Sequence, residues 1–146
     1  MTAGDPGTTL VVRRFLPFPR ARVFAAWLDP ASLAEWMCPG AVTHTVAEID
    51  PRVGGRYRIV MQKPGGDIEH SGEYLAIDRP SRLSFTWMSV NTDRQPTIVT
   101  IDFMEKDGGT ELVLTHRRLP PAMVGDHTKG WTDIVGKLER ALAKSA

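Results

Sequence analysis

The sequence predicts an α+β domain in which a curved antiparallel sheet of about seven strands grips a long C-terminal helix. Three observations lead to this fold class. Between residues 41 and 118, short segments of alternating apolar and polar residues follow one another, joined by turns of two to five residues. Such spacing is typical of an antiparallel meander. A helical apolar stripe occupies the end of the chain, and two short helical patterns follow the first strand.

The length and composition fit a single domain over residues 1–146. A chain of 146 residues is of common single-domain size, and it can bury enough surface to fold without metals or disulfides. Hydrophobic residues make up 42% and charged residues 24%, which argues against disorder. No internal repeat, low-complexity tract or linker divides the sequence.

Charge and targeting features exclude several classes of partner. The formal net charge is +1 and the charges are interspersed, so no basic stripe indicates nucleic-acid binding. No run of eighteen apolar residues predicts membrane insertion, and Met1–Gly7 lacks the apolar core of a signal peptide. The single cysteine, Cys38, suits a reducing compartment, so we expect a cytoplasmic protein. We interpret Cys38 as a small buried hydrophobe.

The first third of the chain contains one strand and two short helices. Thr8–Leu16 is rich in β-branched and apolar residues, which indicates a strand. From Arg20 to Leu28, apolar residues recur with the spacing of a helix face. Asp29 can cap a second helix, and Pro30 suits its first position because the missing N–H has no intrahelical partner there. We expect this helix to end before Pro39.

The rest of the sheet is predicted from alternation and turn residues. Six further strands are expected over Val42–Asp50, Arg56–Lys63, Glu69–Asp78, Arg82–Val90, Pro96–Glu105 and Thr110–Arg117. Glycine, proline and aspartate cluster between most of them, as in hairpin loops. One set of alternating positions is apolar and the other polar, which predicts a sheet with one covered face and one solvated face.

The covering element is a helix predicted from about Ala122 to Lys144. Residues at steps of three or four form an apolar stripe along it: His127, Trp131, Ile134, Leu138 and Leu142. A helix of this length spans about 34 Å, enough to cross the concave face of the sheet. Gly125 and Gly130 each cost about 1 kcal/mol in helical propensity relative to alanine. Close approach to the sheet, or room left for something else, would explain their presence.

The predicted elements carry a series of short motifs between about Leu10 and Leu142. These motifs are Phe24-Ala-Ala-Trp27 with Asp29-Pro30 and Trp36, Gly54-Gly55-Arg-Tyr57, Gly72-Glu-Tyr-Leu-Ala-Ile77, Leu83-Ser-Phe-Thr-Trp87, Val99-Thr-Ile-Asp-Phe103, Gly109-Thr-Glu-Leu-Val-Leu-Thr-His116 and Gly130-Trp131 with Leu138. In their order and spacing they resemble the helix-grip (SRPBCC) superfamily of birch pollen allergens, START lipid-transfer domains and polyketide cyclases. Within it, the chain is most similar to the branch named after an activator of the ninety-kilodalton heat-shock chaperone's ATPase.

The resemblance implies a cavity between the long helix and the sheet, whereas a solid core would satisfy the composition equally well. Ten residues with inward positions are candidates for ligand contact: Tyr57, Met61, His70, Tyr74, Phe85, Trp87, Phe103, His116, His127 and Trp131. Aromatic rings and methionines suit apolar pockets and also fill cores. Trp87 and Trp131 are the strongest candidates for pocket walls, while Trp27 and Trp36 are expected to pack the two short helices.

Three inward histidines, His70, His116 and His127, are candidates for acid–base chemistry or for polar contact with a ligand. A catalytic histidine needs an orienting partner, and both Asp102 and Glu73 have outward strand positions. The sequence contains no Cys-x-x-Cys, His-Glu-x-x-His, Gly-x-Ser-x-Gly or phosphate-binding glycine loop. We therefore assign no catalytic residue, no metal and no cofactor.

The leading functional hypothesis is enclosure of a small apolar or amphipathic molecule, oriented by polar groups of Tyr57, Tyr74, His70 and His116. A co-chaperone that acts on a chaperone ATPase is a second hypothesis, implied by the resemblance alone. A small cyclase- or aromatase-like enzyme is a third, implied by the wider superfamily, although we favour a protein without catalytic activity. A homodimer through an exposed edge strand stays open, and the sequence does not identify the ligand.

Overall fold

The computed structural model describes residues 8–144 and confirms the predicted α+β helix-grip fold. The expectation that Met1–Gly7 is not a signal peptide lies outside the described residues. Within residues 8–144, no helix is both long enough and apolar enough to cross a membrane.

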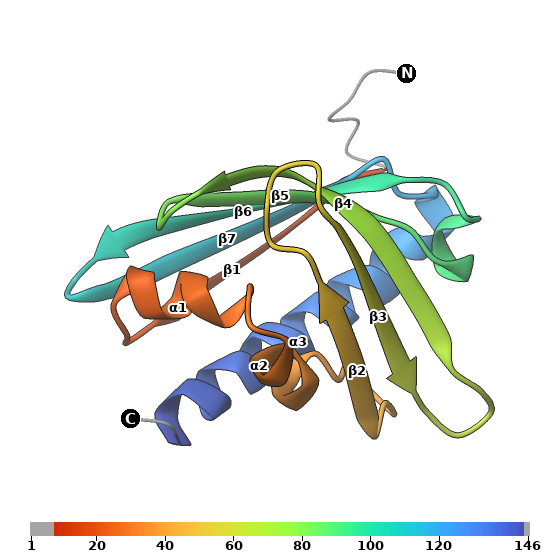
Figure 1. Ribbon diagram of the computed structural model, residues 1–146, viewed down its shortest axis with the longest axis horizontal. Helices are drawn as coiled ribbons and strands as arrows, with labels where there is room; N and C mark the ends of the chain where they lie inside the picture. The colour runs from red at the N-terminus through yellow and green to blue at the C-terminus, as the bar shows by residue number, and fades with distance from the viewer. Residues whose placement is uncertain (1–7, 145–146) are drawn as a thin grey trace.

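In this part of the chain, seven antiparallel strands form one sheet. The strands are β1 (Leu10–Leu16), β2 (His44–Ile49), β3 (Arg56–Gln62), β4 (Ile68–Asp78), β5 (Arg82–Trp87), β6 (Thr97–Lys106) and β7 (Gly109–Arg117). Their order across the sheet is β1-β7-β6-β5-β4-β3-β2, so β2 to β7 form the predicted meander and β1 pairs with β7. The sheet arches over the long helix, and the end that carries β2 and β3 descends beside it (Figure 1).

The helices are α1 (Arg20–Ala26), α2 (Pro30–Trp36) and α3 (Val124–Lys144), with 3-10 turns at Val90–Thr92 and Pro121–Met123. Asp29 caps α2 as predicted, because its carboxylate accepts a hydrogen bond from the N–H of Ala31 at 3.1 Å. Trp27 and Trp36 pack edge to face with ring centroids 4.7 Å apart. These two rings hold the short helices together, as their positions suggest.

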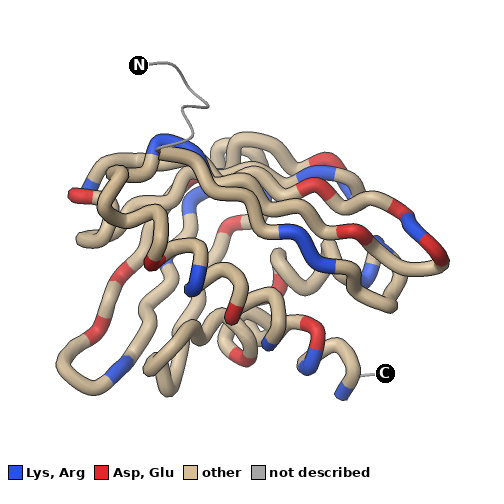
Figure 2. The backbone as a smooth tube through the Cα atoms, turned by 180° about the vertical axis from the view of Figure 1, so that it is seen from behind, with Lys and Arg blue, Asp and Glu red and all other residues tan. Residues whose placement is uncertain are grey.

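Strand alternation divides the sheet into a covered and a solvated face. Along β6, Val99 and Phe103 are completely buried. Asp102 points the other way and pairs with Arg82 of β5 at 2.7 Å, so it cannot orient a buried histidine. Positive and negative residues are interspersed over the described backbone (Figure 2).

The sheet bends along β4. Three residues of β4, from Tyr74 to Ala76, face two residues of β5, which is a β-bulge. Close to this bulge, the side chain of Tyr57 in β3 crosses over Gly72 of β4, and its hydroxyl donates to the backbone oxygen of Thr86 at 2.6 Å. One side chain thereby joins the two strands that flank β4, and only glycine leaves room beneath it.

β5 ends at Trp87 rather than at Val90, where alternation places its end. The reason is a polar turn that begins at Ser89. The Ser89 hydroxyl accepts a hydrogen bond from the N–H of Asn91 at 3.0 Å, and the Thr92 hydroxyl accepts one from the N–H of Ser89 at 3.1 Å. Such side-chain hydrogen bonds compete with strand pairing, so the chain turns and brings Asn91 over the concave face.

The long helix begins at Val124 rather than at Ala122, because Pro121 starts a 3-10 turn ahead of it. Its apolar stripe packs against the concave face, and Trp131, Ile134, Leu138 and Leu142 are all buried. An ion pair of 2.8 Å between Arg14 of β1 and Glu139 ties the helix to one edge of the sheet. The prediction of a long covering helix is confirmed.

Candidate functional site

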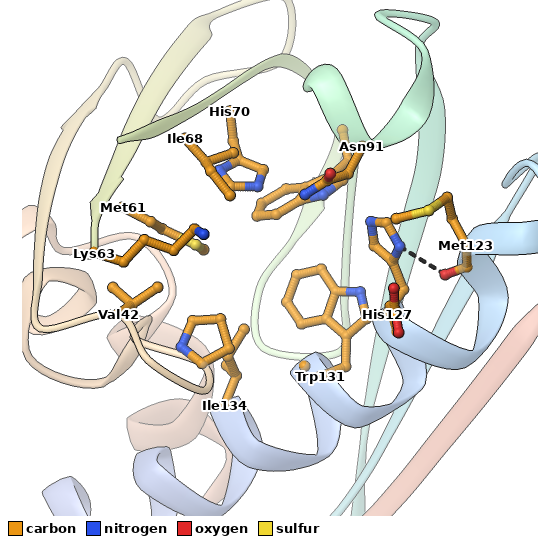
Figure 3. A pocket seen from close by; sticks show the side chains of 14 residues that line it. Val42, Met61, Lys63, Ile68, His70, Asn91, Met123, His127, Trp131 and Ile134 are labelled. Atoms are coloured by element: carbon orange, nitrogen blue, oxygen red, sulfur yellow. Dashed lines mark hydrogen bonds between the residues drawn. The ribbon is translucent and has the colours of Figure 1, made fainter. Parts of the chain in front are cut away.

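A cavity of about 220 Å³ lies between α3 and the β3–β4 hairpin, and it opens to the surface at one end. It is lined by Pro39, Val42, Met61, Lys63, Ile68, His70, Trp87, Asn91, Met123, Asp126, His127, Gly130, Trp131 and Ile134. Figure 3 shows side chains from the hairpin and from α3 converging on this space from opposite sides. The cavity therefore lies where the resemblance implies one.

Aromatic rings form the deep wall of the cavity. The centroids of Trp87 and Trp131 lie 5.0 Å apart, and His70 stacks on Trp87 at 4.5 Å with an interplanar angle of 34°. Met61 and Ile134, both buried, complete this wall with flexible and branched apolar surface. Flat, polarisable surfaces of this kind suit an apolar ring.

Trp131 is held in place by a buried chain of hydrogen bonds. Its indole N–H donates to Nδ1 of His116 at 3.0 Å, and Nε2 of His116 lies 2.7 Å from the hydroxyl of Thr97. That hydroxyl donates to the backbone oxygen of Trp87 at 2.5 Å. Because indole can only donate and the carbonyl can only accept, the chain runs in one direction and places the His116 proton on Nε2.

Both deeply buried histidines are neutral near pH 7. Burial lowers the pKa of His116 to about 3, and the neighbouring His127 adds to this shift. Burial lowers the pKa of His70 to about 4, although the backbones of Ile59 and Ile68 offset part of the effect. Within residues 8–144, Nδ1 of His70 has no hydrogen-bond partner. A ligand or water that reached this nitrogen would satisfy it.

The rim of the cavity is polar. Lys63, Asn91, Asp126 and His127 contribute to it, in contrast to the apolar deep wall. Nδ1 of His127 lies 2.9 Å from the backbone oxygen of Met123, so this nitrogen carries the proton and Nε2 is left as an acceptor in the neutral ring. Burial lowers the pKa of His127, whereas the hydrogen bond to Met123 and the charge of Asp126 oppose the shift.

One part of the rim is fixed to α3 by polar contacts. The N–H of Gly40 donates to the carboxylate of Asp133 at 2.8 Å, and Lys137 donates to the backbone oxygen of Cys38. These contacts hold the segment that contains Pro39 and Val42 against the helix. The rim is therefore built on an anchored loop.

The structure gathers half of the ten predicted ligand contacts around the cavity: Met61, His70, Trp87, His127 and Trp131. Tyr57, Tyr74 and Phe85 instead line an adjacent void of about 20 Å³, which has room for about one water molecule. The Tyr57 hydroxyl is already engaged by Thr86, and burial raises the pKa of both tyrosines.

The remaining two candidates lie away from the cavity surface. His116 stands behind Trp131 and orients it. Phe103 is completely buried and packs edge to face on Phe24 of α1, with centroids 5.1 Å apart. Neither lines the cavity, so we do not retain them as direct ligand contacts.

The lining residues that were not assigned from the sequence come mostly from turns and strand ends. Lys63 and Ile68 flank the β3–β4 hairpin loop, and Asn91 and Met123 belong to 3-10 turns. Turns have no periodicity from which an inward position could be read, whereas Lys63 shares the strand parity of Tyr57 and Met61. The long helix supplies others: Ile134 lies on its predicted apolar stripe, and the cost of Gly130 to a helix already suggests that room is needed there.

The arrangement can hold a flat apolar body against the aromatic wall and a polar group at the rim. Within residues 8–144, no three histidine, cysteine, aspartate or glutamate side chains are placed to hold a metal ion. The orienting groups of His116 are a hydroxyl and an indole rather than a carboxylate. A histidine oriented in this way does not have the geometry of a general base paired with a carboxylate.

A curved antiparallel sheet that packs around a long C-terminal helix, with a cavity between them, is the architecture of the helix-grip class of proteins. Within this class, the chain belongs to the family described as "Activator of Hsp90 ATPase homolog 1-like protein", whose pattern it matches over residues 17–143. No match to the chain is found among the curated proteins.

Several solved structures share the fold. Protein CV1439 from Chromobacterium violaceum is 26% identical, with a TM-score of 0.81 over 91% of this chain and 95% of that chain. Protein NE0264 from Nitrosomonas europaea is 23% identical, with a TM-score of 0.82 over 97% of both chains. PFC0360w, described as an HSP90 activator from Plasmodium falciparum, is 23% identical, with a TM-score of 0.76 over 93% and 96%. At identities below 25%, the similarity to the last two concerns the fold alone.

Proposed function

We propose that this protein binds a small apolar or amphipathic aromatic molecule in the cavity between α3 and the β3–β4 hairpin. The observation that carries the proposal is a space of about 220 Å³ that is lined by the contacting rings of Trp87 and Trp131. Its lining, apolar within and polar at the rim, has the general character of a ligand site.

The volume favours small ligands. An apolar cavity of about 150 Å³ in an engineered protein accommodates benzene. About 220 Å³ therefore suits one ring or two fused rings with a short substituent. A fatty acid or a multi-ring polyketide would have to extend out through the mouth, which makes both less suitable than a compact aromatic compound.

Calorimetric titration with a panel of one- and two-ring aromatic compounds tests the proposal. We expect at least one compound to bind with a stoichiometry near one and to shift NMR signals of Trp131 and His70, which line the cavity. Native mass spectrometry of freshly purified protein would show a ligand that is retained from the cell. Absence of both binding and retained ligand would contradict the proposal.

We expect Gly130→Leu to weaken binding of such a compound at least tenfold, because the added side chain occupies the cavity that residue 130 lines. A Cβ at this position meets only Pro39 at 3.8 Å, so the first atom of the new side chain fits without a clash. Gly125→Leu is the matched control on the same helix, since nothing lies within 4 Å of its Cβ position. Equal affinities of the two variants would show that the compound binds elsewhere.

The family supports a second candidate function, a co-chaperone that acts on an Hsp90-type ATPase. One structural neighbour is described as an HSP90 activator, although at 23% identity it shares only the fold. Titrating this protein into an ATPase assay with the host's own chaperone tests the idea. An unchanged rate of ATP hydrolysis across the titration would contradict the co-chaperone function. The cytoplasmic location that such a partner requires, and a homodimer, stay predictions.

A small cyclase- or aromatase-like enzyme stays the third hypothesis. It would need a polar pair on the cavity wall, and His70 with His127 is the available pair. Chemical change of a bound compound, lost in His70→Leu while binding persists, would support it. A compound that is recovered unchanged from the complex favours a binding protein.

A further inference from the structure

We infer that the ligand is a small aromatic acid, whose carboxylate is held by Lys63 at the mouth of the cavity. This inference rests on the proposed function and specifies the ligand chemistry of the same site.

The ammonium of Lys63 is the positive charge on the rim. Lys63 follows β3 directly, and its side chain extends over the mouth beside Met61 and Val42 (Figure 3). The residue is half-buried. Among residues 8–144, ion pairs form at several arginines and at Lys137, but none forms at Lys63. An ammonium without an ion-pair partner beside apolar surface gains from an anionic ligand group.

The negative charge on the rim, the carboxylate of Asp126, is in contrast already stabilised by neighbouring groups of the protein. Asp126 is exposed and lies in the first turn of α3, where the helix dipole favours a carboxylate. It also lies close enough to His127 to oppose the lowering of that pKa. The rim therefore has one cation without an internal partner, and the complementary ligand group is an anion.

The rim favours a singly charged, planar anion. It offers one ammonium, from Lys63, together with the amide of Asn91. Recognition of a phosphate generally relies on several charged or backbone donors, which this rim does not provide among its lining residues. A carboxylate attached to one ring or two fused rings places its charge at the mouth and its apolar body against Trp87 and Trp131.

The test compares 1-naphthoate with 1-naphthamide, which has a nearly identical shape and no charge. By calorimetry, we expect the wild-type protein to bind the acid about tenfold more tightly than the amide. Lys63→Met should abolish this difference by weakening only the acid. Lys106→Met is the matched control, because Lys106 likewise lies where a strand meets a hairpin turn but is outside the cavity.

Asp126→Asn gives a test of opposite sign. Removing its negative charge from the rim should strengthen binding of 1-naphthoate by about two- to threefold and leave 1-naphthamide unchanged. Equal binding of acid and amide by the wild-type protein would overturn the inference and leave the proposed function intact. The same conclusion follows if only neutral compounds of the panel bind. If no aromatic compound binds, both fail together.

Discussion

We expect the free energy of unfolding to fall by about 6 kcal/mol between pH 7.5 and pH 4, because two buried histidines stay neutral in the folded protein. Burial is the main cause, and it lowers the pKa of His116 to about 3 and that of His70 to about 4. His116 is completely buried and His70 is 5% exposed, so solvent screens neither group appreciably.

The sign of the effect follows from proton binding. In the unfolded chain each imidazole has a pKa near 6.5, so it takes up a proton as the pH falls below that value. The folded protein takes up these protons only near pH 4 and pH 3. At pH values below about 6.5 and above these two folded-state pKa values, the unfolded state binds more protons than the folded state. The free energy of unfolding therefore decreases as the pH falls. By pH 4 each histidine removes about 3 kcal/mol, against a typical total of about 5–15 kcal/mol.

The hydrogen-bond chain behind Trp131 gives a structural reason for the low pKa of His116. Its Nδ1 accepts the indole N–H of Trp131, and its Nε2 is the donor to Thr97. A proton added to Nδ1 would set one N–H against another and break the contact that positions Trp131. Loss of stability and loss of the cavity wall should therefore occur together at low pH.

Urea unfolding at several pH values between 7.5 and 4 measures this effect, and His70→Gln identifies one of its sources. The variant should lose about half of the pH dependence, whatever its stability at pH 7.5. His44→Gln, at an exposed position on β2, is the control and should keep the full dependence. NMR titration of His70 or His116 with a midpoint near pH 6.5 in the folded protein would contradict the argument.

The elements of this fold could be predicted because each of them has a period that a local segment of sequence reveals. Alternation identified the strands, and the three-to-four-residue stripe identified α3. The wall residues Trp87 and Trp131 followed from the same patterns, since strand parity and helix phase state which side chains point inward. The same periodicity therefore predicted part of the cavity wall as well as the fold.

Periodicity could not tell which inward residues border empty space. Tyr57 and Phe103 both have inward parity, yet Tyr57 reaches across β4 to Thr86 and Phe103 meets Phe24 of α1. What lies opposite an inward side chain depends on the bend of the sheet and on how the short helices cover one end of it. These are long-range features, and no local segment encodes them alone.

The rim was the least predictable part of the site for a related reason. Asn91 reaches the cavity through a turn that Ser89 nucleates, and Lys63 lies just beyond the end of β3. Turn residues follow hydrogen-bonding preferences of single side chains. The apolar wall and the histidines His70 and His127 were therefore predictable from the sequence, whereas the rim groups of Asn91 and Lys63 were not assigned from it.

We expect Gly72→Ala to destabilise the protein by about 3 kcal/mol or more, which lowers the melting temperature by about 10 °C. A Cβ on residue 72 would lie 2.0 Å from the backbone oxygen of Thr86 and 2.7 Å from the hydroxyl of Tyr57. No side-chain rotation relieves the first contact, because both the Cβ and the oxygen are fixed by the backbone. Either β5 must move or the 2.6 Å hydrogen bond from Tyr57 to Thr86 must break.

Gly136→Ala is the matched control for thermal unfolding, because it makes the same chemical change in the interior of α3. Its Cβ would meet only a nitrogen of Arg14, at 4.0 Å, so we expect a gain of about 1 kcal/mol from helical propensity. A Gly72→Ala variant that melts within 2 °C of the wild-type protein would show that β4 and β5 can separate at little cost. In that case the hydrogen bond from Tyr57 to Thr86 would contribute little to holding β3 and β5 together.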